Sequence, residues 1–411
     1  MRAWRRWVGI GAATGIVLAL VPVVRGNVGI GALRKAEPRS PGLVLPSEHL
    51  AGLDLLRMDV RPRRVTTPLR DGKVAELTVD PVLQRAAMAE LKRYKVPEGG
   101  VVVIEPSTGK ILTYASYVNE GAKFDVNLRA EAPAASVFKV ITGAALIEKA
   151  GLNAKTEQCY HGGKSAIAAD ELQDDERRDK WCATLAIAMG RSLNVVFGRL
   201  AQKNLTPDDV TAMGGAFGFG APIPFPVQSE KLLIDIPVDP LEFARASAGF
   251  WHTTLSPLGG ALIAQTVANR GVTLEPRIVQ AVYKENDKLW EDTRGPTTLR
   301  RAVKPETAAE LNTMMLETVS NGSAYKSFHD KHGKPYLPDI AVAGKTGTLM
   351  RQKNGRFYTW FVGYAPADKP EVAIAALVVN TPTWQIKGPE LARNVLRAYF
   401  AKKGAKGVTA P

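Results

Sequence analysis

The chain has very little cysteine, only Cys159 and Cys182 among 411 residues, so it can form at most one intramolecular disulfide. In an oxidising compartment these two residues could pair, and closing that loop would stabilise the fold by about 3–4 kcal/mol in the chain-entropy model. They could instead be two inert buried thiols. A metal site formed with His161 is a third reading, but it lacks a convincing fourth ligand.

The body of the chain also lacks an excess of charge. The formal net charge is +14, but residues 71–386 carry 36 basic and 35 acidic side chains, so the excess lies near the two ends. A nucleic-acid enzyme usually carries its basic surface on the folded body, where phosphates are held, so we expect no nucleic-acid partner. The composition, 45% hydrophobic and 23% charged, and the absence of repeats instead indicate a globular body with a sizeable core.

One long apolar run is present, and it lies near the N-terminus. Residues 8–24 carry no charge and follow Arg2, Arg5 and Arg6. A helix of that length measures about 25 Å, just enough to span a bilayer, and basic residues favour the cytoplasmic side. We expect residues 1–25 to be a cytoplasmic tip and an uncleaved single-pass anchor in the cytoplasmic membrane, with the remaining chain exported. A cleaved signal peptide and a buried soluble helix are the alternatives.

Residues 26–70 contain several prolines and little periodicity, which predicts a linker or a reduced pedestal. Regular patterns begin at residue 71. Strands are expected at 74–79, in hairpins over 101–116 and 275–292, and at 340–349, 356–364 and 371–380. Helices are expected at 133–150, 182–203, 206–217, 239–248, 256–270, 305–320 and 388–402.

This order of elements predicts an α/β fold class. An antiparallel five-stranded sheet, built from both ends of residues 71–401, would be covered by helices on both faces. A mainly helical subdomain, about 133–320, would be inserted between its strands. Residues 402–411 would follow as a basic tail.

Serine stands three positions before lysine at three places, a spacing that puts both side chains on one helix face. The pair Ser107–Lys110 contains a turn glycine, and Ser323–Lys326 follows a predicted helix end. Ser136 and Lys139 differ because they open an apolar helical run. A helix start favours developing negative charge, and apolar surroundings lower the pKa of an ammonium, so Lys139 is a candidate base for a Ser136 nucleophile. Taken alone, the pair is better explained as an ordinary surface serine and lysine on a helix.

Two further motifs follow in the chain. Ser192 and Asn194 form the only Ser-x-Asn, in the helical middle, and Lys345-Thr346-Gly347-Thr348 occurs once, on a predicted strand. The order Ser-x-x-Lys, Ser-x-Asn, Lys-Thr-Gly, each on the expected type of element, resembles the penicillin-binding protein and serine β-lactamase superfamily.

The resemblance extends over residues 71–401. Residues 77–85 and the hairpin 101–116 look like the opening of the transpeptidase domain of high-molecular-mass penicillin-binding proteins, and residues 342–348 and 360–366 look like its closing half. It implies the β-lactamase/transpeptidase-like fold and peptidoglycan DD-transpeptidase activity. D-Ala-D-Ala stem peptides would be the substrate, and β-lactams the inhibitors.

The resemblance also implies the role of each motif residue. Ser136 would be the nucleophile, Lys139 its base, and Ser192 a proton relay to the leaving amine. Asn194 would hold the substrate amide and the Lys139 amine, and Lys345 would attract the terminal carboxylate of the substrate. Two hydroxyl groups and a glycine of the same strand would line the substrate site: Thr346, Gly347 and Thr348. The backbone N–H groups of Ser136 and Thr348 would form the oxyanion hole, and no metal or cofactor is needed.

The chain departs from the family pattern at two places. It has Pro133-Ala134-Ala135 where the family usually has Pro-Gly before the serine, and residues 248–252 read Ala-Gly-Phe-Trp-His where a Gly-Gln-Gly-like turn is common. Residues 26–70 are too short for a glycosyltransferase domain, so a separate glycan-polymerising partner is expected. The alternatives are a DD-carboxypeptidase, a β-lactamase or β-lactam sensor, and a non-catalytic cell-wall scaffold.

Overall fold

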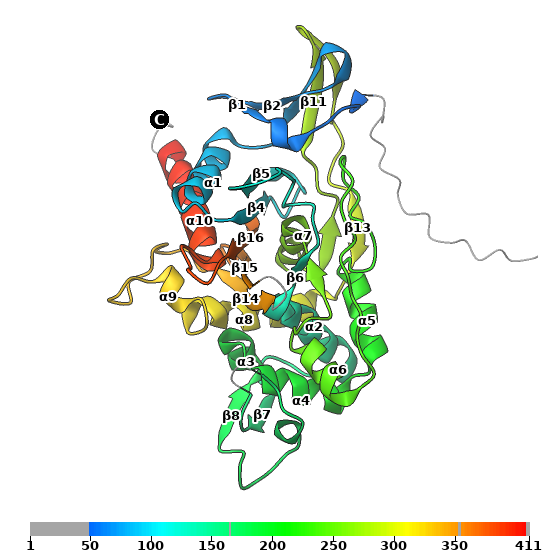
Figure 1. The fold of residues 1–411 in the computed structure, drawn as a ribbon, viewed down its shortest axis with the longest axis vertical. Helices are drawn as coiled ribbons and strands as arrows, with labels where there is room; N and C mark the ends of the chain where they lie inside the picture. Colours follow the sequence, from blue (N-terminus) through cyan, green and yellow to red (C-terminus); the bar gives the residue numbers. More distant parts are fainter. Residues whose placement is uncertain (1–48, 164–165, 352–354, 408–411) are drawn as a thin grey trace, which may run out of the picture. The chain divides into compact units, whose positions relative to one another are not determined.

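The computed structural model describes residues 49–163, 166–351 and 355–407 (Figure 1). All of these residues belong to one structural unit, Pro41–Pro411. Within this part of the chain, none of the helices combines the length and the apolar composition needed to cross a membrane. The predicted anchor at residues 8–24 lies outside the described residues and stays a prediction.

Five antiparallel strands form the central sheet, in the order β14–β15–β16–β4–β5. Val101 on β4 pairs with Ala376 on β16, so the sheet joins strands from the two ends of the domain. Every residue of β16 is buried, as expected for a central strand that is covered on both faces. The strands run over Ala343–Arg351 (β14), Arg356–Ala365 (β15), Val372–Asn380 (β16), Glu98–Ile104 (β4) and Ile111–Val118 (β5).

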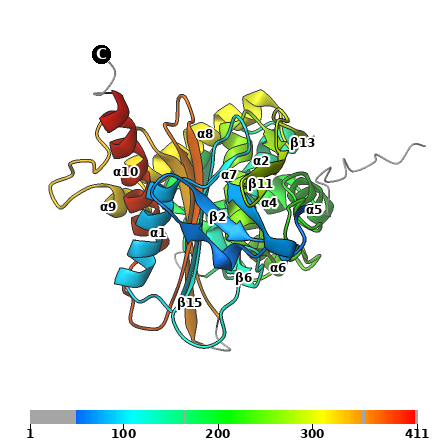
Figure 2. The same cartoon turned by 90° about the horizontal axis from the view of Figure 1, so that it is seen from above.

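Helices cover both faces of this sheet, as Figure 2 shows. On one face lie α1 (Pro81–Arg93) and the C-terminal α10 (Gly388–Gly407), which pack against β5, β15 and β16. On the other face, α7 (Pro257–Ala268) is buried from Pro257 to Val267, and it is apolar on all sides because sheet and helices surround it. The predicted α/β class, with an antiparallel sheet between helical layers, is confirmed.

The middle of the chain forms the inserted helical part. Its helices are α2 (Lys139–Ala150), α3 (Leu185–Arg191), α4 (Asn194–Asn204), α5 (Pro207–Ala216), α6 (Pro240–Ser247), α8 (Pro305–Ser320) and α9 (Tyr325–Phe328). Helix α2 packs against α4, α5 and α8, and α4 packs against α6. One expected helix, 182–203, is wrong at its start and is broken in the middle. Residues Trp181–Thr184 form strand β8, because they pair with β7 (Glu157–Tyr160), and the helix that follows stops at Ser192.

A second antiparallel sheet lies at the other end of the fold (Figure 1), in the order β1–β2–β3–β11–β12. Its strands are Asp59–Val60, Val65–Pro68, Lys73–Leu77, Val279–Lys284 and Asp287–Glu291. It thus takes in part of the segment expected to be a linker or a reduced pedestal, together with the hairpin expected at 275–292. Two smaller pairs complete the strands: β6 (Ala132–Pro133) with β9 (Thr254–Leu255), and β10 (Val272–Leu274) with β13 (Thr298–Arg301).

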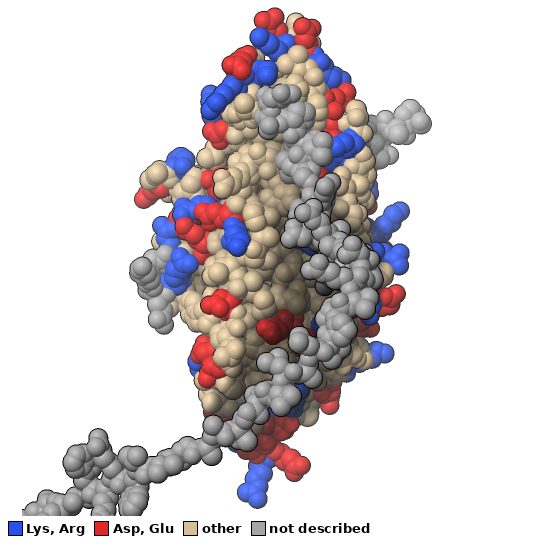
Figure 3. Space-filling view, turned by 90° about the vertical axis from the view of Figure 1, so that its right-hand side faces the viewer, with Lys and Arg blue, Asp and Glu red and all other residues tan. Residues whose placement is uncertain are grey.

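Charged side chains of both signs are mixed on the surface. On the face drawn in Figure 3, lysine and arginine lie among aspartate and glutamate, and much of the centre is uncharged. That face shows no continuous basic surface among its described residues, in agreement with the balanced charge of residues 71–386.

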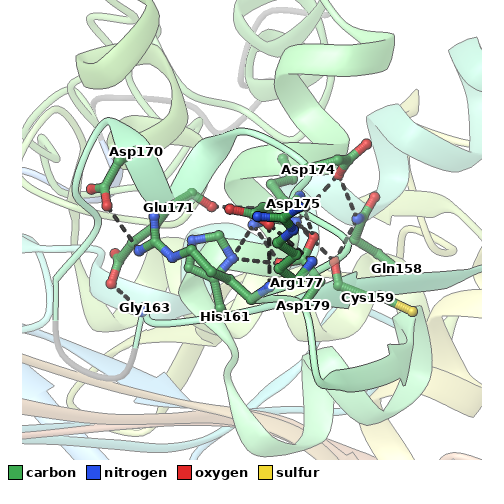
Figure 4. A network of polar contacts seen from close by, with 12 residues as sticks. Gln158, Cys159, His161, Gly163, Asp170, Glu171, Asp174, Asp175, Arg177 and Asp179 are labelled. Carbon is green, nitrogen blue, oxygen red and sulfur yellow. Dashed lines mark hydrogen bonds and ion pairs between the residues drawn. The ribbon is translucent and has the colours of Figure 1, made fainter.

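A buried ionic network attaches the β7–β8 hairpin to α4 (Figure 4). Arg199 on α4 is fully buried and donates two hydrogen bonds to the Asp179 carboxylate, at 2.7 and 2.9 Å. It also donates to the carbonyl oxygens of Glu171 (2.7 Å) and Cys159 (3.0 Å). Hydrogen bonds from Arg199 hold the pKa of Asp179 well below its usual range, so this pairing stabilises the fold above about pH 4 and is lost as the pH falls.

The structure also joins Cys159 and Cys182 in a disulfide between β7 and β8. His161 lies against Asp179 and Arg199, with its Nδ1 atom 2.5 Å from Asp179 Oδ1. The two sulfur atoms and the imidazole therefore do not form a ligand set for a metal ion here. The covalent bond joins the two strands, and the ionic network holds the loop between them against α4.

Replacing Arg199 by leucine should lower the free energy of unfolding by about 3–5 kcal/mol, because Asp179 is then buried without its guanidinium partner. A denaturant titration of the full chain measures the change. The matched control is Arg178→Leu, whose ion pair with Asp170 is about half exposed and should contribute less than about 1 kcal/mol. Equal losses in the two variants would contradict the structural role of Arg199.

Candidate active site

Ser136 and Lys139 are brought together by a tight helical turn. Residues Ala135–Phe138 form a 3₁₀ helix that continues directly into α2 at Lys139. In a 3₁₀ helix the side chains at positions i and i+3 are eclipsed, so the lysine amine lies directly above the serine hydroxyl. The Lys139 Nζ atom is 3.0 Å from Ser136 Oγ. The irregular first turn, where a continuous helix 133–150 was expected, is therefore what aligns the pair.

The residue before the serine has an unusual backbone conformation. Ala135 has a φ of 50°, in the left-handed region that favours glycine. This is the position at which the chain lacks the family's usual glycine. Gly249 lies against it with a φ of 93°, and a Cβ atom there would be 2.2 Å from the Ala135 carbonyl oxygen. The close approach of these two segments fixes the backbone that carries Ser136.

The Lys139 amine is fully buried and has three polar neighbours. Besides Ser136, its Nζ atom is 2.7 Å from Asn194 Oδ1 and 2.6 Å from the carbonyl oxygen of Ala248. These two oxygens can only accept hydrogen bonds, so they use the two N–H bonds of a neutral amine. The amine lone pair is then left to accept the hydroxyl proton of Ser136. Lys139 is thus arranged as a base for the serine.

The electrostatics favour this neutral form. Burial, which removes water from the ammonium, lowers the pKa of Lys139 well below its usual value, and the charge of Lys345 lowers it further. The Phe197 ring, 5.7 Å from the nitrogen atom, is part of the surrounding apolar wall. An unprotonated Lys139 amine in this position can take the proton of Ser136 without the help of a further base.

Ser192 and Asn194 reach the site because the helix is interrupted between them. Ser192 has left-handed backbone angles (φ 58°, ψ 45°) and ends α3, and Asn194 begins α4. Both side chains line the same cavity as Ser136. Because the helix is interrupted here, the two side chains contact different amines. Asn194 contacts the Lys139 amine, whereas Ser192 contacts the Lys345 amine.

Lys345 lies on β14, the edge strand next to the nucleophile. Its fully buried amine donates to Ser192 Oγ at 3.0 Å and to the carbonyl oxygen of Thr346 at 2.9 Å. Burial lowers its pKa to about 7. A Cβ atom at Gly347 would lie 3.2–3.3 Å from atoms of residues 134–137, so this glycine lets the strand approach the 3₁₀ turn closely.

The motif side chains surround an open cavity of about 370 Å³. Ser136, Ser192 and Asn194 lie on its helical side, and Thr346 and Thr348 lie on β14. Lys139 and Lys345 are buried beside it. The structure thus brings together all the predicted site residues except the cysteine pair, which lies in the β7–β8 hairpin.

Several residues of the site were not anticipated. The carbonyl group of Ala248 has no signal in the sequence, because any residue could supply it. Ser323, which stands at the predicted end of a helix in the third Ser-x-x-Lys pair, lines the cavity, and its Oγ atom is 2.5 Å from Thr346 Oγ1. Arg191 and Phe250 also line the cavity. In the sequence, only their positions next to Ser192 and Gly249 indicate that they lie near the site.

The arrangement has the parts required for acyl transfer through a serine. A hydroxyl nucleophile faces a neutral amine, a second amine can carry positive charge, and both border one cavity of a size suited to a small peptide. This class of site, a serine nucleophile with a lysine base, is defined by geometry alone.

Comparisons with known proteins specify the class further. The family model "Penicillin binding protein transpeptidase domain" matches residues 99–400. The chain is 30% identical over 347 residues to peptidoglycan D,D-transpeptidase PbpA of Mycobacterium tuberculosis, which covers 76% of this chain and 68% of that protein. The chain belongs to the family of penicillin-binding protein transpeptidase domains.

Solved structures agree with this assignment. The D,D-transpeptidase domain of a peptidoglycan glycosyltransferase from Eggerthella lenta has a TM-score of 0.66 and 27% identity, over 80% of this chain and 84% of that one. Penicillin-binding protein A from M. tuberculosis, as its penicillin G acyl-enzyme complex, has a TM-score of 0.64 and 25% identity, over 79% of this chain and 80% of that one.

The rate of acylation by benzylpenicillin should follow a bell-shaped pH profile. It should fall towards acidic pH as protonation removes the Lys139 lone pair, with a midpoint well below the ordinary lysine pKa. It should fall towards alkaline pH as Lys345, whose pKa burial lowers to about 7, loses the charge that attracts a carboxylate. The two apparent pKa values belong to the coupled pair.

The variant Lys345→Arg separates the two limbs, because arginine stays protonated at every accessible pH. Second-order acylation rates between pH 5 and about 10 should then retain the acidic limb and lose the alkaline one, whatever the absolute rate. An unchanged alkaline limb would assign that limb to another group.

Proposed function

We propose that this protein is a peptidoglycan DD-transpeptidase that cross-links stem peptides through a Ser136 acyl-enzyme. The observation that carries the proposal is the contact between Lys139 and Ser136, in which the amine's other two hydrogen-bond directions are occupied. Membership of the transpeptidase family supports the same reaction, as does the named activity of the M. tuberculosis relative.

In the first half of the reaction, Ser136 Oγ attacks the carbonyl carbon between the two D-alanines, and its proton passes to Lys139. The developing oxyanion is received by the backbone N–H groups of Ser136 and Thr348. The C–N bond then breaks, and the leaving D-alanine takes up the transferred proton by way of the Ser192 hydroxyl. Lys345 holds the terminal carboxylate throughout, together with the hydroxyl groups of Thr346 and Thr348.

In the second half, an amine from a neighbouring stem peptide attacks the acyl-enzyme. It forms the new amide bond, loses a proton to the same base, and restores the Ser136 hydroxyl. Gly347 keeps β14 close to the ester, and Asn194 holds both the substrate amide and the Lys139 amine. β-Lactams present a strained amide to the same groups and would acylate Ser136 as inhibitors.

The location of the reaction is part of the proposal. The apolar run at residues 8–24 would anchor the chain once in the cytoplasmic membrane and place the folded domain on the periplasmic, extracytoplasmic side. A separate glycosyltransferase would polymerise the glycan strands. The paired cysteines support an oxidising compartment, since disulfides rarely persist in the cytosol.

Fluorescent penicillin should label the wild-type chain covalently and should not label Ser136→Ala. A gel of the two variants measures the difference, and Ser323→Ala, which retains the nucleophile, is the matched control that should still be labelled. Product analysis with D-Ala-D-Ala peptides and an acceptor amine should then show cross-linked dimer. Equal labelling of wild type and Ser136→Ala would refute the assignment, and release of free acid alone would point to a carboxypeptidase.

Thiol trapping in intact cells tests the compartment. Maleimide should react with neither cysteine of the wild type until a reductant is added, because Cys159 and Cys182 are paired. The control is Cys159→Ser, which leaves the exposed Cys182 free and should react without reduction. If the wild type reacts as readily as this control, an oxidising location is contradicted.

A further inference from the structure

One charged side chain of the catalytic cavity has no role in the reaction described above. Arg191, the last residue of α3, is exposed and lines the cavity directly beside Ser192. No hydrogen bond or ion pair engages its guanidinium within the described parts of the chain. Other arginines of this part of the fold behave differently: Arg199 is paired with Asp179, and Arg245 with Glu242.

The charged side chains around this cavity are all positive. Apart from Arg191, its lining contains hydroxyl, amide and apolar side chains, and no carboxylate among the described residues. Lys345 is the other cation, but it is buried beneath the surface, hydrogen-bonded to Ser192, and has a pKa of about 7. Arg191 by contrast is exposed and lines the cavity itself. Two cations therefore act on one cavity, and one of them is committed to the terminal carboxylate.

The backbone around Arg191 is held in place, so its side chain starts from a fixed point beside the cavity. Ser192 ends α3 in a left-handed conformation. The Gly190 carbonyl accepts a hydrogen bond from the Ser323 N–H at 2.9 Å, which fixes α3 to the loop that also carries the Ser323 hydroxyl. An arginine on such a fixed turn offers a planar fork that matches a carboxylate, with little backbone entropy left to lose.

We propose that Arg191 forms an anion subsite in the catalytic cavity, which takes a second carboxylate of the substrate in addition to the terminal carboxylate held by Lys345. The inference rests on the proposed transpeptidase function and specifies its substrate class: peptides, or β-lactams, that carry a further acidic side group. Arg191 selects among substrates by this contact and takes no part in the proton transfers.

Carbenicillin and benzylpenicillin are suitable probes, because they differ by one carboxylate on the acyl side chain. The quantity to measure is the ratio of their second-order acylation rates at Ser136, obtained by competition with fluorescent penicillin. In Arg191→Gln the ratio of carbenicillin to benzylpenicillin should fall about threefold to tenfold relative to wild type, and Arg191→Lys should retain part of it. Added salt should lower the ratio in wild type more than in Arg191→Gln.

The matched control is Lys326→Gln. Lys326 is an exposed cation on α9 that does not line the cavity, so its loss changes the net charge equally and should leave the ratio unchanged. A fall of the same size in this variant would show a general effect of charge and overturn the subsite. An unchanged ratio in Arg191→Gln would overturn it directly.

Two results would separate this inference from the proposed function. If neither β-lactam acylates Ser136 in the wild type, the proposed function fails and the subsite fails with it. If the wild type is acylated but Arg191→Gln loses both rates by the same factor, the function stands, and Arg191 shapes the site without recognising a carboxylate.

Discussion

The burial of the Lys139 amine is the constraint on which the rest of the site depends. An amine that burial removes from water is costly to protonate. Two oxygens that only accept hydrogen bonds engage the N–H groups of Lys139 and leave its lone pair for Ser136. The three neighbours of the amine come from three separate segments: the 3₁₀ turn, the start of α4, and the residue that caps the C-terminal end of α6. The base is therefore formed only when these three segments of the helical part are packed together.

The sheet supplies the second amine and holds it at a fixed position. β14 is an edge strand whose register with β15 pairs Lys345 with Val362. Because Gly347 has no side chain, β14 can approach the nucleophile closely. Because both lysines are buried near one another, the charge of Lys345 helps to keep Lys139 neutral. The cost of two desolvated amines is met by the extensive packing around them, including the fully buried α7 and β16.

Two of the eight non-glycine residues with positive φ in the described part of the chain lie where these elements meet. Ala135 and Ser192, neither of them glycine, both have left-handed angles next to catalytic groups. The disulfide joins the two strands of the β7–β8 hairpin, and the Arg199 network holds this hairpin against α4, the helix that begins with Asn194. The turn at the end of α3 places both Ser192 and Arg191 at the cavity. The position of the motif serine and the proposed recognition of a second anion therefore depend on the same backbone turn.

The sequence by itself determined the α/β class, most of the strands and helices, and the identity of the motif residues, because periodicity and spacing are local properties. It did not determine the start of the predicted helix 182–203, since Trp181–Thr184 form a strand only through pairing with Glu157–Tyr160. Nor did it indicate the Ala248 carbonyl, the Ser323 hydroxyl or the free Arg191, which the tertiary structure alone brings to the cavity. The neutral state of Lys139 was likewise decided by tertiary packing, because desolvation depends on what surrounds a group and not on its neighbours in the chain.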